Sequence, residues 1–217
     1  WSRIGTDSIG LDYWYQILPD MARNGSTVFA AQLSPANTTM HRGEQLIHQV
    51  EDVLAITGKK KLNLIGHSHG GPTVLYVAAT QPQYIASITG VAGTYHGSKV
   101  ADDLLSNQAG SQLLSIATDY IIGPLITFAE GNPALKSDLH ASLTSISEQG
   151  SQVFNQKYPT TALAADCSKS GATSNNGIYY YSWTGTSQVT NVIDVADSAI
   201  SLLAPISYIS TDNDGLV

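Results

Sequence analysis

Apolar residues in the first hundred positions follow two alternating patterns: the spacing of an amphipathic helix, and short continuous runs. The clearest helical pattern lies in residues 42–58, where Leu46, Ile47 and Val50 share one face and Gly58 follows as a stop. The predicted helices cover residues 11–25, 42–58 and 71–82, and the predicted strands cover residues 26–34, 61–66 and 85–93. Because strands separated by helices need crossover connections, this order predicts an α/β fold with a mostly parallel sheet and helices on both faces.

The pattern is weaker toward the two ends of the chain. In the first predicted helix Asp12 is the expected N-cap and Gly25 the expected stop, although Pro19 interrupts the helical spacing. Residues 177–185 predict one more strand, and residues 201–217 run from an apolar stretch into an Asp-rich turn.

From residue 101 to residue 150 the chain is rich in small and apolar residues without the alternation of a strand. The apolar residues between Leu113 and Phe128 are too numerous for one solvated helix face. Two interpretations are open: a helical insertion that packs on the core, or a mobile cover with an apolar underside.

Composition limits the classes of function. A chain of 217 residues fits one domain with a sizeable core. It carries 10 Lys and Arg against 17 Asp and Glu, and its only basic run is Lys59, Lys60 and Lys61, so no nucleic-acid partner is expected. No apolar run is long enough for a transmembrane segment. The single cysteine, Cys167, has no partner within the chain; such a thiol is usually buried or incidental, but an odd cysteine can also mean a missing partner.

One serine stands in the sequence G-H-S-H-G between a predicted strand and a predicted helix. A nucleophile elbow requires this order of strand, sharp turn and helix. Gly66 and Gly70 stand where a side chain is expected to collide across the turn, and Pro72 suits the first turn of a helix. Ser68 is therefore the predicted nucleophile, and the backbone N–H of His69 is a predicted oxyanion donor at the positive end of the helix. The alternative is a Gly-rich phosphate-binding turn, which would require a lysine or more backbone N–H groups.

A serine nucleophile needs a base, and none of the six histidines is a good candidate. His67 and His69 flank Ser68, but neighbouring side chains on a tight elbow point away from the serine hydroxyl, so both are expected to pack or to support the site. On this architecture the order along the chain is Ser, Asp or Glu, then His, and no histidine follows Asp214. His96 follows a strand and could reach the rim of a site. The remaining histidines are expected on helix surfaces or as caps: His41, His48 and His140.

Six segments, taken in order along the chain, resemble the secreted bacterial triacylglycerol lipases of the Pseudomonas and Burkholderia type, lipase family I. They are LDYWYQI, RGEQLIHQVEDVL, NLIGHSHGGPTVLYVAATQP, YHGSKVADDL, YYYSWTG and NDGLV. The resemblance spans nearly the whole chain and implies an α/β-hydrolase fold and hydrolysis of acyl esters at a lipid interface. It also implies that Ser68 is the nucleophile and that Asp214, in NDGLV, is the acid of the triad. Without it, Asp214 would be interpreted as a turn former.

The same resemblance implies several accessory features. Asp194 is similar in position to a ligand of a structural calcium ion, whereas from the residues alone it would be a helix cap. Cys167 is similar to the first half of the family's single disulfide. Residues 101–150 coincide with the family's lid, which favours the mobile cover. Members of the family are secreted and extracellular, and they commonly need calcium and a dedicated folding chaperone.

The chain also departs from the family pattern. Family members begin with a strand ending in an H-G motif, whose next residue donates the second oxyanion N–H; here the sequence opens at Trp1, just beyond it. The family's catalytic histidine, second cysteine and other calcium ligands follow NDGLV. We therefore expect a fragment that is nearly inert alone. Two other functions stay open: a carboxylesterase acting on soluble short-chain esters, and a non-catalytic binding protein that keeps the elbow as scaffold.

Overall fold

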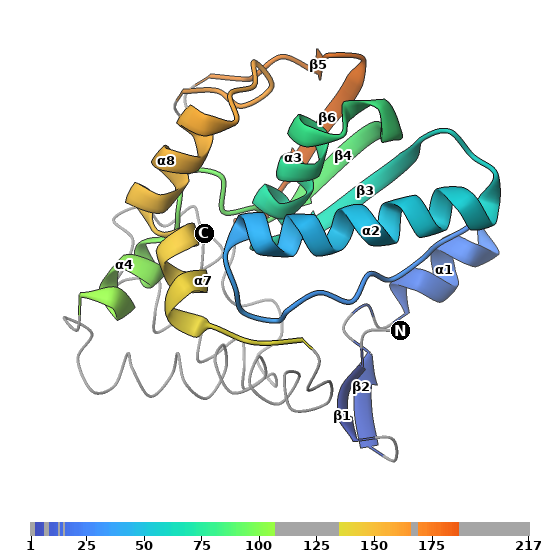
Figure 1. Cartoon of the computed structure of the whole chain (residues 1–217), viewed down its shortest axis with the longest axis horizontal. Coiled ribbons are helices and arrows are strands. Elements are labelled where there is room, and N and C mark those ends of the chain that lie inside the picture. Colours follow the sequence, from blue (N-terminus) through green and yellow to red (C-terminus); the bar gives the residue numbers. More distant parts are fainter. Residues whose placement is uncertain are drawn as a thin grey trace.

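A four-stranded sheet with the strand order β3-β4-β6-β5 forms the centre of the molecule (Figure 1). The strands β3, β4 and β6 are parallel to one another, and β5 pairs antiparallel with β6. Their bounds are Leu62–His67 for β3, Ile85–Val91 for β4, Ser174–Asn175 for β5 and Ile178–Trp183 for β6. The structure is a computed structural model, and it describes residues 3–6, 9–12, 14, 16–106, 135–165 and 169–186.

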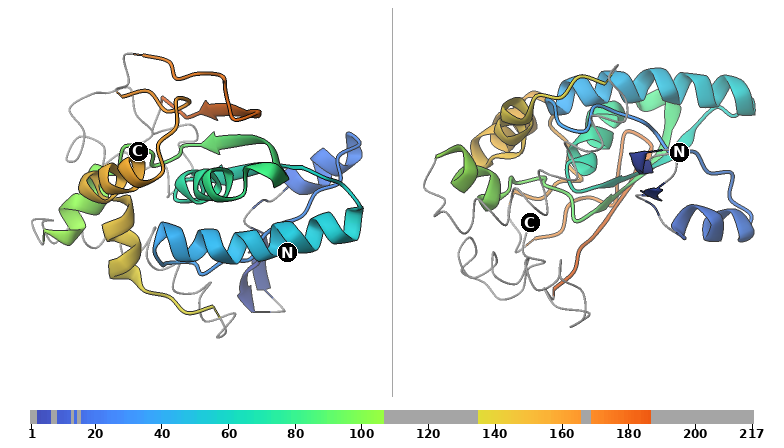
Figure 2. Two further views of the ribbon diagram at one scale, coloured as in Figure 1. Left: turned by 45° about the horizontal axis from the view of Figure 1, so that its top comes forward. Right: turned by 90° about the horizontal axis from the view of Figure 1, so that it is seen from below.

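Helices connect the parallel strands, as the sequence predicted. The helices α2 and α3 lie together along one face of the sheet, and the view from below places α1 on the opposite side from α2 (Figure 2). A two-stranded antiparallel ladder, β1 with β2, precedes α1. The remaining elements are β1 (Arg3–Thr6), β2 (Ile9–Asp12), α1 (Ile17–Arg23), α2 (Thr39–Thr57), α3 (Gly70–Thr80), the 3-10 turn η1 (Pro82–Tyr84), α4 (Lys99–Leu105), α7 (Leu139–Ile146) and α8 (Glu148–Lys157).

The helix α2 begins and ends on clear local signals. The Thr38 side chain caps its first turn by accepting a hydrogen bond from the His41 N–H over 3.1 Å. Gly58 follows the last turn in the left-handed region, at φ 66°, and its N–H donates to the Leu54 carbonyl over 2.9 Å. The predicted stop at Gly58 is thus confirmed.

Two of the predicted elements differ from the structure. Residues 26–34 do not form a strand. The N–H groups of Gln32 and Ser34 instead donate to the side-chain amides of Gln49 and Gln45 on α2, over 2.9 Å and 2.8 Å. These side chains supply the partners that a neighbouring strand would otherwise have to provide.

The first helix is shorter than predicted. Asp12 pairs with Arg3 in the β1–β2 ladder, so the prediction of Asp12 as its N-cap is wrong. The helix begins instead at Ile17, after Gln16 in the left-handed region. Pro19 therefore falls in the first turn, where its missing N–H leaves no helical bond unmade.

The core lies between the sheet and the face formed by α2, α3 and α8. Val77, Ile85 and Ile178 are fully buried there, and every residue from Gly71 to Ala78 on α3 is buried as well. Each such aliphatic side chain contributes roughly 1.5 to 3 kcal/mol by leaving water. The core thus fixes α3 against β3 and β4, and with it the turn that joins β3 to α3.

Candidate active site

The turn around Ser68 joins a strand to a helix through one strained residue. The strand β3 ends at His67, α3 begins at Gly70, and Ser68 between them has a φ of 53°, in the left-handed region that residues with a side chain rarely occupy. Its N–H donates to the Val91 carbonyl over 2.9 Å, and its carbonyl accepts from the Gly71 N–H over 2.9 Å. Such strain persists only where the surroundings hold it, and it gathers at functional sites. The strand, turn and helix that G-x-S-x-G requires are all present.

Close backbone crossing explains one of the two glycines that flank the serine. A Cβ at Gly66 would overlap the carbonyl of Gly70, so no side chain fits there. At Gly70 the Cβ position faces open space, so the prediction of a collision there is wrong. The carbonyl of Gly70 is the group that crosses close to Gly66. The close approach between α3 and the loop after β4 occurs one residue later, at Gly71. A Cβ at Gly71 would lie 2.8 Å from the Cα of Gly93.

A second strained residue lies beside the elbow and was missed by sequence reasoning. Ala92 follows β4 with a φ of 45°, and its N–H donates to the Trp183 carbonyl over 2.8 Å. Together with the bond from Ser68 to Val91, this bond ties the carboxyl ends of β3, β4 and β6 to one another. Alanine carries none of the usual sequence marks of a positive φ, so no signal was available to find it.

Glycines also form a slot for the ring of Tyr95 under the elbow. A Cβ at Gly90 or Gly93 would overlap this ring, and one at Gly71 would lie 3.2 Å from it. Burial raises the pKa of the Tyr95 hydroxyl to about 12. Tyr95 is therefore a neutral packing residue, and three glycines are needed to accommodate it.

The ring of His69 is buried, and each of its nitrogens has a hydroxyl partner. Nε2 lies 2.8 Å from Thr39 Oγ1 and Nδ1 lies 3.2 Å from Ser142 Oγ. Burial, aided by the positive charge of Arg42, holds the pKa of the imidazole well below its usual value, so the ring is neutral. With both nitrogens engaged, His69 has no site for a proton from Ser68. The ring is therefore not arranged as a base for Ser68, and its supporting role in the site stays a prediction.

The backbone of His69 is held on its carbonyl side. The carbonyl accepts from the Thr73 N–H over 3.3 Å and from Thr73 Oγ1 over 2.7 Å, and Thr73 is fully buried. Among the backbone hydrogen bonds of the described residues, none is donated by the His69 N–H. This N–H lies at the N-cap of α3, where helix N–H groups point toward the turn.

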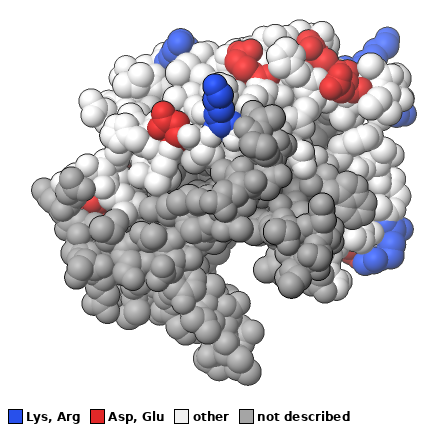
Figure 3. All heavy atoms as spheres, turned by 60° about the horizontal axis from the view of Figure 1, so that its bottom comes forward, with Lys and Arg blue, Asp and Glu red and all other residues white. Residues whose placement is uncertain are grey.

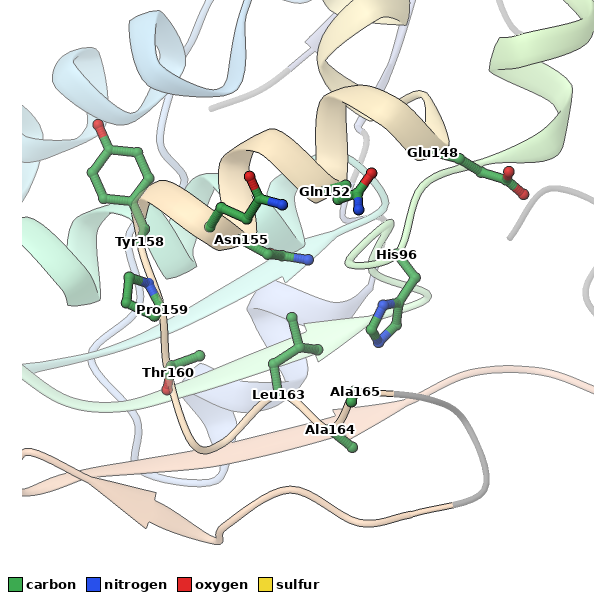
Figure 4. A pocket seen from close by; sticks show the side chains of 11 residues that line it. His96, Glu148, Gln152, Asn155, Tyr158, Pro159, Thr160, Leu163, Ala164 and Ala165 are labelled. Atoms are coloured by element: carbon green, nitrogen blue, oxygen red, sulfur yellow. The ribbon is translucent and has the colours of Figure 1, made fainter.

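The other histidines are dispersed over the molecule. His67 lies 6.4 Å from the Trp14 ring, centroid to centroid, in an edge-to-face arrangement. His96 lines a hollow of about 330 Å³ between α8 and the segment after it, with Asn155 and Leu163 among the other residues lining it (Figure 4). The three histidines predicted at surface positions are exposed there: His41, His48 and His140.

Three predicted site residues fall outside the described residues: Asp214, Asp194 and Cys167. Within the described ranges, no group of three or more His, Cys, Asp and Glu side chains is arranged to hold a metal ion. The expected cover at residues 101–150 is described only at its two ends, by α4 on one side and α7 and α8 on the other.

The described surface gives few clues to a charged ligand. On the face shown in Figure 3, the described Lys and Arg side chains are scattered and no continuous basic stripe joins them. None of the described helices is long and apolar enough to cross a membrane.

Known proteins resemble the chain over nearly all its length. The family of the alpha/beta hydrolase fold matches residues 5–217. Triacylglycerol lipases from Vibrio cholerae serotype O1, Burkholderia plantarii and Pseudomonas fragi are 41%, 34% and 32% identical to it. Each alignment covers 98% of this chain, and 69%, 69% and 76% of the respective relative.

Solved structures agree on the fold. The mature lipase BlEst2 of Bacillus licheniformis superimposes with a TM-score of 0.57 at 17% identity, over 84% of this chain and 60% of that one. The metagenomic carboxyl esterase MGS0156 gives 0.56 at 18% identity, over 92% of this chain and 51% of that one. This chain thus spans about half to three fifths of the length of those two structures. The predicted fold and resemblance are confirmed, and the chain belongs to the triacylglycerol lipases of the α/β-hydrolase family.

Proposed function

We propose that this protein hydrolyses the acyl esters of triacylglycerols at a lipid–water interface, with Ser68 as its nucleophile. The observation that carries the proposal is the strained elbow: Ser68 is held at φ 53° between β3 and α3, with its backbone bonded to Val91 and Gly71. The 41% identity to a triacylglycerol lipase supports the choice of substrate class.

The reaction proceeds in two halves. Ser68 Oγ attacks the ester carbonyl and forms a carbon–oxygen bond while the carbonyl electrons move onto oxygen. The hydroxyl proton passes to a histidine that Asp214 orients, and then to the departing alcohol as the tetrahedral intermediate collapses. Water then attacks the carbonyl of the acyl-enzyme in the same way, which releases the fatty acid and restores the Ser68 hydroxyl.

The developing oxyanion is stabilised at the start of α3. The N–H of His69 points from the N-cap, and the helix dipole adds partial positive charge at the same end. The Ser68 carbonyl, which shares a peptide group with this N–H, accepts from the Gly71 N–H over 2.9 Å, so the donor needs little reorganisation during the reaction. One such donor contributes roughly 10² to 10³ in rate.

The test compares emulsified triacylglycerol with a dissolved short-chain ester, using the full-length protein and its Ser68→Ala variant. The proposal predicts a rate that rises steeply once the ester exceeds its solubility limit, and no rate in the variant. Equal rates on dissolved and emulsified ester would instead identify a carboxylesterase. Absence of hydrolysis on both, without a fluorophosphonate adduct, would identify a binding protein.

Further features are proposed on the resemblance alone. They are secretion, a cover at residues 101–150, a folding chaperone, a disulfide at Cys167 and a structural calcium ion at Asp194. A carboxylate such as Asp194 is a ligand type that calcium prefers. We expect a chelator to lower the midpoint of thermal unfolding of the full-length protein and added calcium to restore it, because a bound ion stabilises only the folded state. Unfolding curves that coincide with and without the chelator would exclude the calcium site.

A further inference from the structure

Three helices meet at the ring of His69. Thr39 is the first residue of α2, His69 is the N-cap of α3, and Ser142 lies in α7. All three side chains are buried, with 3%, 7% and 5% of their surface exposed. The two partners lie 30 residues before and 73 residues after the histidine, so the ring joins parts of the chain that are distant in sequence.

The hydrogen bonds at the ring can be completely satisfied. A neutral imidazole offers one donor and one acceptor, while each hydroxyl can donate one hydrogen bond and accept others. One hydroxyl, of Thr39 or Ser142, therefore donates to the ring and the other accepts from it, whichever tautomer is present. A buried group with both partners in place is held rigidly, and loss of either partner leaves an unsatisfied polar atom.

The helix α7 has ties to the start of α2 that do not pass through the ring. Ser145 Oγ accepts a hydrogen bond from the Thr39 N–H over 3.3 Å, and the Asp138 N–H donates to the Ala36 carbonyl over 2.7 Å. Ser142 and Ser145 are three residues apart and so share one face of α7. Of these two serines, Ser142 alone is hydrogen-bonded to the ring of His69. Substituting each serine in turn therefore distinguishes the packing of α7 against α2 from the hydrogen bond to the imidazole.

We infer that the imidazole of His69 is a positioning residue: held by Thr39 and Ser142, it fixes the direction of its own peptide N–H, the donor offered to the oxyanion. This inference rests on the proposed function. The peptide group that carries this N–H is held at its other end, where the Ser68 carbonyl accepts from the Gly71 N–H. Thr73 holds the following carbonyl and the two hydroxyls hold the ring, so His69 is fixed through both its backbone and its side chain. An oxyanion donor acts only when its hydrogen already points at the position where charge develops, so a small rotation of this peptide lowers the rate without changing how the ester binds.

The experiment measures kcat and KM on a dissolved p-nitrophenyl ester with the full-length protein and four variants. In His69→Leu, which fills space without hydrogen bonds, we expect kcat to fall about 10- to 100-fold with KM within about twofold. His69→Gln keeps one donor and one acceptor and should recover most of the loss. Ser142→Ala should lower kcat about 3- to 10-fold, whereas the matched control Ser145→Ala should stay within about twofold of wild type.

A second readout uses the oxyanion directly. The rate of inactivation by a fluorophosphonate depends on the same donor, because its phosphoryl oxygen takes the place of the carbonyl oxygen. This rate should fall in parallel with kcat across the variants. Thermal unfolding is recorded for each variant, and all rates are compared well below the lowest midpoint. If His69→Leu does not fold, the positioning role is tested by His69→Gln and by the comparison of Ser142→Ala with its control Ser145→Ala.

Two results would overturn the inference: wild-type kcat in both His69→Leu and Ser142→Ala, or an equal fall in Ser142→Ala and Ser145→Ala. Either would make the ring a packing residue only. Failure of the proposed function is a separate result, because it shows as hydrolysis that survives Ser68→Ala. If Ser68→Ala is inactive while the His69 and Ser142 variants match wild type, the function stands and the positioning role does not.

Discussion

The two sides of the elbow differ although the sequence places a histidine on each. On one side His67 ends β3, on the face of the sheet that also carries Ile65, and the ring of Trp14 approaches it there. Ile65 is 45% exposed, and on the same face Trp183 is 63% exposed. On the other side His69 is buried and bonded through both ring nitrogens.

The left-handed turn at Ser68 produces this difference. A strand sends alternate side chains to opposite faces, so His67 follows the alternation of β3. Ser68 then reverses the local chain direction, and His69 opens a helix packed against the core. Identical residue types two positions apart thus have different surroundings: an aromatic ring lies beside His67, and two hydroxyls bind the ring of His69. The following predictions test this contrast, beginning with the largest expected effect.

Ser68→Ala removes the hydroxyl of the residue that lies between the two histidines. We expect kcat on emulsified triacylglycerol to fall on the order of 10⁴-fold or more, since a triad without its nucleophile retains little activity. The fold should persist, because the bonds of Ser68 to Val91 and Gly71 are made by its backbone and not by its hydroxyl. Circular dichroism and thermal unfolding serve as the control. Activity within tenfold of wild type would contradict the role of Ser68.

Gly66→Ala breaks the turn that separates the two histidines. The added Cβ overlaps the backbone carbonyl of Gly70, which cannot move without displacing α3. We expect the free energy of unfolding to fall by about 3 kcal/mol, the upper end for overpacking, and activity to fall with it. Urea denaturation measures the change. A loss below about 1 kcal/mol would mean that the crossing is looser than the geometry indicates.

Lowering the pH should reduce the free energy of unfolding through the buried imidazole of His69. Burial and Arg42 keep the pKa of its folded imidazole well below the ordinary 6.5. The unfolded chain therefore gains a proton that the folded chain excludes, and the stabilising contribution of the neutral ring, full above about pH 6.5, is lost as the pH falls toward the folded pKa. In that window wild type should lose up to about 1.4 kcal/mol per pH unit relative to His69→Gln. Urea denaturation at a series of pH values checks this, and parallel curves for the two proteins would contradict it.

Gly70→Ala is the matched partner of Gly66→Ala and should have the smallest effect. The Cβ position at Gly70 is open, its φ is not in the left-handed region, and alanine has the higher helix propensity. We expect the free energy of unfolding to change by less than about 1 kcal/mol, with kcat within about twofold of wild type. A loss as large as that of Gly66→Ala would show that both glycines are constrained.

Local patterns predicted the central part of the fold and the elbow. The run before Gly66, the serine between two histidines and the apolar helix after Pro72 are contiguous, so each signal is visible in one short segment. Side-chain alternation and helix propensity act at that range. The same holds for Gly58, whose left-handed cap needs no partner far along the chain.

Features that depend on distant partners could not be predicted. The strand expected at residues 26–34 does not form, because backbone N–H groups of this segment donate to the side chains of Gln45 and Gln49 on the following helix. Likewise, nothing near His69 in the sequence indicates Thr39 or Ser142 as partners of its ring. Long-range hydrogen bonds of this kind do not show in the spacing of apolar and polar residues along the sequence. The predictions for Asp214, Asp194 and Cys167 stay predictions, because these residues lie outside the described part of the chain.

The most direct test of the central claim, that Ser68 is the nucleophile, is fluorophosphonate labelling of the full-length protein followed by mass spectrometry of its peptides. The account predicts one adduct per chain, on the peptide that contains Ser68, and none in Ser68→Ala. Failure of the wild-type protein to react, or an adduct on another residue that persists in Ser68→Ala, would contradict it.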